Sequence, residues 1–249
     1  MKLMSNRLLP EGQKNSHLPN SGIDTNQISQ LVSASKTFEE GGSIVRAVDK
    51  ASFSICRGEL VGITGPTGSG KTTLLNLIGM LESPSAGEVF FEGSSVKQLS
   101  EAERRQLRLK KIGFVFQQLR LMRSLSVIEN IELPIALLSK PRDLQRERAL
   151  HLIRSVGLET KEHRRPDMLS VGEQQMAAIA RALANNPILI LADEPTSHLD
   201  SASGDRIINL LDQLRKSLNV AVVVSTHDPN IGARMDRVYK MRDGLLAIG

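Results

Sequence analysis

The sequence has few of the features that mark extracellular or membrane-spanning proteins. Among its 249 residues, Cys56 is the only cysteine, so no disulfide can form within the chain and a reducing compartment is favoured. The longest apolar runs, such as residues 188–192 and 220–224, are far too short to cross a bilayer. The first residues lack the apolar core of a secretory signal. We therefore expect a cytoplasmic protein that reaches a membrane only through a partner.

Aromatic residues are also scarce, which argues against nucleic acid as a partner. The chain has no tryptophan, and Tyr239 is its only tyrosine, whereas proteins that bind single strands stack the bases on aromatic side chains. The net charge is 32 − 27 = +5, and much of the basic excess lies between Arg104 and Arg165. Such a charge run is typical of a solvated face, or of a surface near anionic lipid head groups.

What the chain does contain is the alternation of strands and helices of an α/β protein. Residues 1–28 are rich in Asn, Ser, Gly, Pro and Gln and predict a flexible tail, which leaves 29–249 as one domain. The continuous apolar strands among helices predict a parallel sheet covered on both faces. We expect strands at 32–38, 45–48, 51–55, 60–64, 88–92, 112–116, 188–192 and 220–225, helices at 74–79, 100–111, 141–157, 170–186 and 201–217, and a hairpin turn at 243–244.

The most informative segment is a glycine-rich loop between the apolar run 60–64 and the expected helix at 74–79. It reads G-x-x-x-x-G-K-T, and this strand–loop–helix setting is what a phosphate-binding loop requires. Its N–H groups and the start of the helix would surround an anion, Lys71 would reach the β- and γ-phosphates, and the Thr72 hydroxyl would ligate Mg²⁺. The loop comprises Gly65, Pro66, Thr67, Gly68, Ser69, Gly70, Lys71, Thr72 and Thr73.

Two further strands end in polar residues that suit the same chemistry. The run 188–192 leads into Asp193 and Glu194, and the run 222–224 leads to His227. Because ligands of parallel sheets bind beyond the C-terminal ends of the strands, Asp193 is placed to hold Mg²⁺. Glu194 can act as the general base for water, and His227 can contact the γ-phosphate or that water.

The order of these motifs resembles the ATP-binding cassette (ABC) ATPases over about residues 28–249. Residues 169–175, Leu-Ser-Val-Gly-Glu-Gln-Gln, resemble the signature of that family, Gln117 matches its Q-loop, residues 197–200 match its D-loop, and His227 matches its switch histidine. Ser170 and Glu173 also form a capping box, which would aim a helix start and a hydroxyl at an anion. The resemblance implies a P-loop (RecA-like) core, an antiparallel β subdomain and a helical signature subdomain near 118–180.

The resemblance further implies Mg²⁺-dependent ATP hydrolysis by two copies, with two ATP molecules sandwiched between them. The γ-phosphate on one copy would then meet the signature helix of the other. Adenine would stack on Phe38, beside Val45. Beyond the phosphate loop, the implied nucleotide-binding residues are Phe38, Val45, Ser170, Gly172, Glu173 and Asp200, the implied metal-binding residues are Thr72, Gln117 and Asp193, and the implied catalytic residues are Glu194, His227 and Gln117.

Residues 114–118 and 121–134 look like the lipoprotein-releasing, macrolide-export and cell-division branch of the family. That likeness implies an integral membrane permease as partner, and a place on the inner face of the cell membrane. Two alternatives stay open: an ATP-switched mechanical or regulatory module that transports nothing, and a soluble ABC ATPase. The short single cassette argues against the second.

Two residues depart from the family pattern. Val171 stands where the signature usually has glycine, and Met176 replaces a common arginine. A β-branched residue cannot adopt a positive φ cheaply, and it brings bulk toward the phosphate. We therefore expect ATP-driven closure to be slowed rather than abolished.

Overall fold

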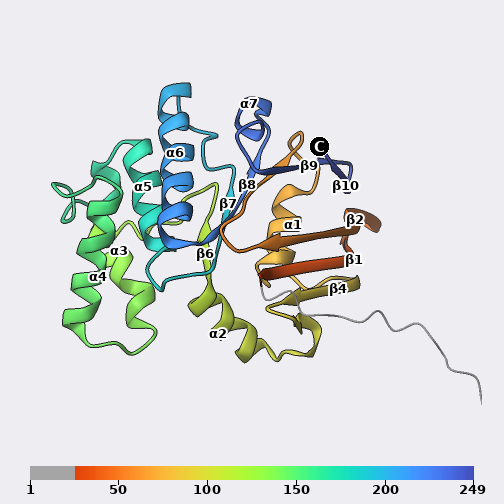
Figure 1. Cartoon of the computed structure of the whole chain (residues 1–249), viewed down its shortest axis with the longest axis horizontal. Coiled ribbons are helices and arrows are strands. Elements are labelled where there is room, and N and C mark those ends of the chain that lie inside the picture. The colour runs from red at the N-terminus through yellow and green to blue at the C-terminus, as the bar shows by residue number, and fades with distance from the viewer. Residues whose placement is uncertain (1–25) are drawn as a thin grey trace, which may run out of the picture.

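The computed structural model describes residues 26–249, in which ten strands form one sheet flanked by helices (Figure 1). The strand order is β5-β4-β1-β2-β10-β9-β3-β8-β7-β6. The strands are β1 (Gln27–Glu40), β2 (Ser43–Cys56), β3 (Leu60–Thr64), β4 (Ala86–Phe91), β5 (Ser94–Ser95), β6 (Ile112–Val115), β7 (Leu189–Asp193), β8 (Ala221–Thr226), β9 (Arg237–Arg242) and β10 (Leu245–Ile248). The α-helices are α1 (Lys71–Ile78), α2 (Glu101–Lys111), α3 (Val127–Ala136), α4 (Arg142–Ser155), α5 (Val171–Ala182), α6 (Ser201–Leu218) and α7 (Pro229–Gly232), with short 3₁₀ turns at Val96–Gln98 and Pro166–Met168.

The antiparallel part of the sheet is built on the long hairpin of β1 and β2. Gly41 and Gly42 form its turn, and both have positive φ. The prediction of separate strands at 45–48 and 51–55 was wrong, because β2 passes through an irregular Lys50 with φ of 47° without ending. The C-terminal bound expected for the flexible tail, residue 28, was also too late, because Ile28 is already a buried residue of β1. The rest of that expectation, residues 1–25, lies outside the described residues.

The parallel part of the sheet places the polar strand ends next to one another. β3, β6, β7 and β8 run parallel, with Thr64 paired to Thr226 and Asp193 paired to Ser225. Because all four strands point the same way, the residues that follow them gather at one edge of the sheet. The phosphate loop, the two carboxylates and His227 therefore start from adjacent strands.

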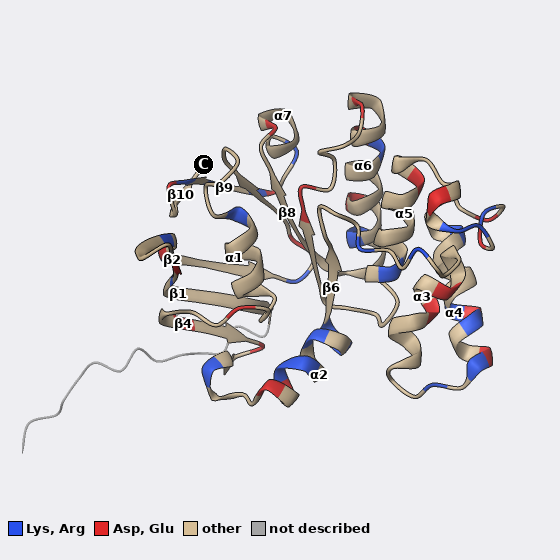
Figure 2. Cartoon of the chain, turned by 180° about the vertical axis from the view of Figure 1, so that it is seen from behind, with Lys and Arg blue, Asp and Glu red and all other residues tan. Residues whose placement is uncertain are grey.

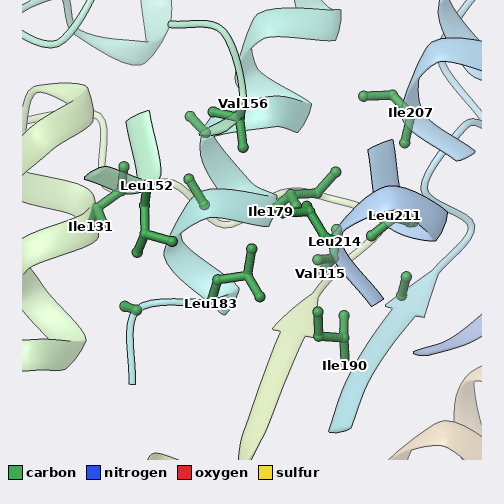
Figure 3. Packing of buried hydrophobic residues seen from close by; sticks show 14 of the residues in the cluster. Val115, Ile131, Leu152, Val156, Ile179, Leu183, Ile190, Ile207, Leu211 and Leu214 are labelled. Atoms are coloured by element: carbon green, nitrogen blue, oxygen red, sulfur yellow. The ribbon is translucent and has the colours of Figure 1, made fainter. Parts of the chain in front are cut away.

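Both faces of this parallel sheet are buried, as the sequence predicted. In β7, Ile190 and Ala192 belong to one hydrophobic cluster, whereas Leu189 and Leu191 belong to the other. Figure 3 shows the first cluster, in which Val115 and Ile190 lie beneath side chains of α5 and α6 such as Ile179 and Leu211. The second cluster packs α1 between the parallel strands and the β1–β2 hairpin. This alternation explains why the strand sequences are apolar without interruption.

The helix starts follow the capping pattern of the sequence. The capping boxes expected at Ser100 and Ser170 are both formed, and a third is formed at Ser126. The expected hairpin turn also joins β9 to β10, with Asp243 and Gly244 both at positive φ. Lys and Arg residues are frequent along α2, part of the basic stretch of the sequence (Figure 2). Over residues 26–249, none of the helices has the length and apolar character required of a membrane span.

Candidate nucleotide-binding and hydrolytic site

The loop between β3 and α1 is shaped by close backbone contacts that only glycine permits. A Cβ atom on Gly65 would lie 2.0 Å from the Met241 carbonyl oxygen, and one on Gly70 would lie 2.0 Å from the Ala47 carbonyl oxygen. Gly68 and Gly70 have positive φ values of 80° and 104°. Ser69 is 3% exposed, and its hydroxyl has no hydrogen-bond partner among the described residues. A curled loop with an unpaired buried hydroxyl fits an anion such as a phosphate.

Lys71 begins α1, and its ammonium group is held by oxygen atoms on several sides. The Nζ atom donates to the carbonyl oxygens of Gly65 and Pro66 at 2.9 Å each, and lies 3.1 Å from Glu194 Oε1. The Lys71 side chain is 4% exposed and that of Glu194 is 11% exposed. The loop, its lysine and the second carboxylate of β7 therefore form a single charged cluster.

Asp193 lies at the end of β7 between two hydroxyl groups. Thr72 Oγ1 donates to its Oδ2 atom at 2.8 Å, and Ser225 Oγ donates to its Oδ1 atom at 2.6 Å. A carboxylate beside a threonine hydroxyl is the set of hard oxygen donors that Mg²⁺ prefers. The residues present therefore fit the metal that the sequence predicted.

Glu194 follows Asp193 in a left-handed backbone conformation, with φ of 44°. Its N–H group lies 3.2 Å from the Ser225 carbonyl oxygen and 2.9 Å from the Ser225 hydroxyl oxygen. The turn in the backbone directs its carboxylate to Lys71 on one side and to His227 on the other, with His227 Nδ1 3.0 Å from Glu194 Oε2. Lysine, glutamate and histidine thus form one connected row.

Gln117 and the two residues expected to bind adenine, Phe38 and Val45, lie around this centre. Gln117 lines the same hollow as Thr72 and Asp193. Phe38 and Val45 are paired across the β1–β2 hairpin, and Lys36 Nζ lies 5.0 Å from the centre of the Phe38 ring. Because Gly70 packs against Ala47, two residues beyond Val45, the hairpin adjoins the phosphate loop.

The signature segment forms a capped helix start. Ser170 is the N-cap of α5: its N–H donates to Glu173 Oε2 at 2.9 Å, and its Oγ accepts from the Glu173 N–H at 3.4 Å. Hydrogen bonds from the Lys161 ammonium and the Ser170 N–H lower the pKa of the Glu173 carboxyl. Val171 is an ordinary helical residue and is 46% exposed. The expected conflict with a positive φ was therefore wrong, because neither Val171 nor Gly172 has a positive φ.

The signature residues do not lie with the phosphate loop in this chain. Ser170, Gly172, Glu173 and Asp200 line a separate hollow, which they share with His198. Asp200 caps α6 by accepting from the Ser203 N–H at 2.9 Å. Among residues 26–249, no hydrogen bond or ion pair joins this group to residues 65–73. The phosphate loop and the signature residues thus lie on different parts of the surface.

Sequence reasoning missed two polar residues that organise this region. Arg181 of α5 donates to the carbonyl oxygens of Leu119 and Arg120 at 2.6 and 2.5 Å, and both of those residues have positive φ. Burial lowers the pKa of the Arg181 guanidinium. Nothing in the sequence pattern indicates this pairing. Ser225 was detectable, because it is a small polar residue that follows the apolar run Val222–Val224.

The comparisons with known proteins agree with this geometry. The profile of the family described as "ABC transporter" matches residues 48–197. The chain is 44% identical over 211 residues to the "Lipoprotein-releasing system ATP-binding protein LolD" of Paramagnetospirillum magneticum, which covers 85% of this chain and 93% of that protein. It is also similar to the ATP-binding cassette MJ0796, solved as a dimer in "a post-hydrolysis state" bound to ADP and Pi, with a TM-score of 0.82, 40% identity, and coverage of 89% of this chain and 98% of that one.

A third similarity is to cbiO1 from Clostridium perfringens, described as part of the ABC transporter complex cbiONQ. That structure has a TM-score of 0.80 and 28% identity, with 89% of this chain and 87% of that chain covered. The matches span the sheet, the phosphate loop and the signature helix together, so they concern the whole described fold and not the phosphate loop alone. The chain therefore belongs to the ABC transporter family, and it is an ATP-binding cassette that hydrolyses ATP.

Proposed function

We propose that the cluster around Lys71 is the hydrolytic half-site, and that it works with Mg²⁺. The observation that supports this proposal is the row of Lys71, Glu194 and His227 beside the hydroxyl-bound Asp193. Thr72 and Asp193 would hold the metal, with Gln117 beside them. When bound, Mg²⁺ neutralises charge on the phosphate oxygens.

Each residue of this half-site then has a role that its position supports. Lys71 and the loop N–H groups bind the β- and γ-phosphates, and Phe38 and Val45 bind adenine. Glu194 accepts the proton of the attacking water, while His227 orients the Glu194 carboxylate or the γ-phosphate. Positioning and charge stabilisation account for most of the catalysis in phosphoryl transfer, and these contacts provide the part of both that one chain can supply.

The second half-site belongs, in this proposal, to a second copy of the chain. Ser170, Gly172, Glu173 and Asp200 lie around the positive end of α5, which suits a γ-phosphate presented from outside. Because these residues lie apart from the phosphate loop, a complete site needs two chains that face each other head to tail. The dimeric structure of the related cassette MJ0796 supports this arrangement.

We further propose that the dimer acts at the cytoplasmic face of the cell membrane, bound to an integral membrane permease. Leu81, Leu133 and Leu137 are 42%, 39% and 65% exposed and line an apolar groove together with Arg105 and Arg120. Exposed leucines beside arginines suit an amphipathic segment of a membrane partner. The likeness to a lipoprotein-releasing ATP-binding protein supports a transport role.

The variant Glu194→Gln tests the hydrolytic assignment. It keeps the shape of the side chain and one oxygen that can accept from Lys71 but removes the base, so we expect ATP binding to persist while turnover falls by about 10²–10⁴-fold. The trapped ATP should hold two copies together, which sizing chromatography with ATP and Mg²⁺ would show as a dimer.

Glu101→Gln is the matched control, because Glu101 is a 66% exposed residue of α2 whose ion pairs within residues 26–249 are with arginines of its own helix. It should hydrolyse ATP at the parent rate. If Glu194→Gln also hydrolyses at the parent rate, Glu194 is not the base and the proposed mechanism fails.

A further inference from the structure

Ser225 connects the two acidic residues of the hydrolytic half-site through one hydroxyl group. It lies in β8, is 0% exposed, and pairs with Asp193 of the neighbouring strand. Its hydroxyl donates to Asp193 Oδ1 at 2.6 Å and accepts from the Glu194 N–H at 2.9 Å. No other described side chain bonds to both residues.

The first of these hydrogen bonds fixes the plane of the Asp193 carboxylate. One oxygen accepts from Ser225 and the other accepts from Thr72, so the group is held from both sides. A carboxylate oxygen that accepts one hydrogen bond keeps a further lone pair for a metal ion. Residues that hold a metal ligand in place in this way set its orientation and its basicity.

The second hydrogen bond supports a strained backbone. Glu194 has φ of 44°, a strained conformation that residues other than glycine rarely adopt. Its N–H is held by the carbonyl oxygen and the hydroxyl oxygen of the same residue, Ser225. Because this turn directs the carboxylate to Lys71 and His227, the hydroxyl helps to aim the base as well as the metal ligand.

We propose that Ser225 is a positioning residue, whose single hydroxyl sets both the Mg²⁺-binding orientation of Asp193 and the backbone turn of Glu194. The inference rests on the proposed function, because it takes Asp193 as the metal ligand and Glu194 as the base. Ser225 touches neither water nor nucleotide in this assignment. It acts through the two carboxylates.

The test compares Ser225→Ala with Ser225→Thr, which keeps the hydroxyl, and with Ser29→Ala as the matched control. Ser29 is also a buried strand serine, 1% exposed, but its hydroxyl has no partner among residues 26–249. Electron paramagnetic resonance of Mn²⁺ measures the affinity for Mn²⁺·ATP, and nucleotide titration in EDTA measures metal-free ATP binding. Phosphate release at varied Mg²⁺ and ATP gives kcat and KM, and thermal unfolding reports folding.

For Ser225→Ala we expect Mn²⁺·ATP affinity and kcat to fall by roughly 10–100-fold, the usual effect of losing a partner of a metal ligand. Metal-free ATP binding should stay near the parent value, because the phosphate loop is untouched, whereas the KM for Mg²⁺·ATP should rise with the lost metal affinity. Ser29→Ala should match the parent in every binding and rate measurement. Ser225→Thr should recover most of the metal affinity. If its added methyl group prevents folding, the result for Ser225→Ala alone decides the test.

Parent-like Mn²⁺·ATP affinity and kcat in a folded Ser225→Ala protein would overturn the inference and leave the proposed function intact. A parent protein that binds no Mn²⁺·ATP would instead overturn the proposed metal site, and the inference with it. An equal loss in metal-free and metal-bound nucleotide affinity would show a general structural role, which also contradicts the positioning role.

Discussion

At the scale of single residues, the Lys71–Glu194 pair is the most constrained contact of the site. Both side chains are largely buried, and the ammonium group also binds two carbonyl oxygens of its own loop. Breaking a buried ion pair by removing one partner costs about 3–5 kcal/mol, because the remaining charge is left without compensation. Here His227 remains beside Glu194 and moderates that cost.

We predict that Lys71→Ala loses nucleotide binding and hydrolysis. Lys71 provides the only side-chain cation of residues 65–73, so the phosphate oxygens lose their strongest counter-charge. Titration with a fluorescent ATP analogue and phosphate release are the measurements. Lys216→Ala is the control, since Lys216 is 64% exposed and its one ion pair in the described part of the chain is with Asp212 of its own helix. Near-normal binding and hydrolysis in Lys71→Ala would contradict the assignment of the loop.

The positions of residues in the site could be predicted where they follow from the end of a strand, and not where they depend on a partner in space. Asp193 and His227 were found because each follows an apolar strand. The pairing of Lys71 with Glu194 depends on the left-handed turn at Glu194, which no pattern in the sequence marks. The hydrogen bonds of Arg181 to residues 119 and 120 could not be predicted from the sequence either, because 61 residues separate Arg120 from Arg181.

At the scale of elements, the start of α5 decides how the signature can meet a phosphate. The helix begins with a full capping box at Ser170 and Glu173, so its first N–H groups are ordered before any ligand arrives. Val171 is the first residue after the cap, and 46% of its surface is exposed at the hollow that it shares with Asp200. Its side chain therefore lines the same hollow as Ser170 and Gly172.

We predict that Val171→Gly strengthens ATP-dependent pairing of two copies and lowers thermal stability without nucleotide. Removing the side chain lets the Gly172 N–H come closer to the γ-phosphate, a charge-assisted hydrogen bond worth roughly 1.5–3 kcal/mol at most. Glycine in a helix costs about 0.5–1 kcal/mol. Sedimentation at matched ATP measures the pairing, and thermal unfolding measures the stability.

Ala102→Gly is the control for that variant, because Ala102 lies in the first turn of α2, outside both half-sites. It should lower thermal stability to a similar extent and leave the pairing unchanged. Pairing of Val171→Gly that equals or falls below the parent would show that Val171 is harmless and that its bulk does not limit approach.

Elements with strong local signals were predicted well. The helices that begin at Ser100 and Ser170 have capping boxes, and the hairpin turn at 243–244 has residues suited to positive φ. The failure was β2, where Lys50 adopts a positive φ inside a strand that continues. Pairing with β1 on one side and β10 on the other holds this strand together, and such long-range support is absent from local patterns.

At the scale of the whole molecule, the two half-sites lie on different parts of one chain. The phosphate loop lies between β3 and α1, whereas the signature begins α5 on the helical side (Figure 1). Within a single chain, ATP held by the phosphate loop would have no signature helix in contact with it. Catalysis in the proposed dimer therefore depends on the encounter of two chains.

We predict that ATP hydrolysis per molecule rises with protein concentration and then levels off. A dimer with composite sites follows mass action, so dilution below its dissociation constant removes the second half of each site. Phosphate release measured across a dilution series at saturating ATP and Mg²⁺ tests this. A rate per molecule that stays constant down to concentrations at which sedimentation shows only single chains would mean that one chain hydrolyses ATP alone.

The bonds of Arg181 make α5 and the segment after Gln117 a single mechanical unit. Residues 119 and 120 cannot slide past α5 without losing two hydrogen bonds from the half-buried guanidinium of Arg181, each worth about 1.5–3 kcal/mol. Displacement of that segment by a few ångströms is therefore easier if the helix travels along with it. Because Arg181 lies near the C-terminal end of α5, whose N-cap is Ser170, a displacement near Gln117 would be passed to the helix that carries the signature.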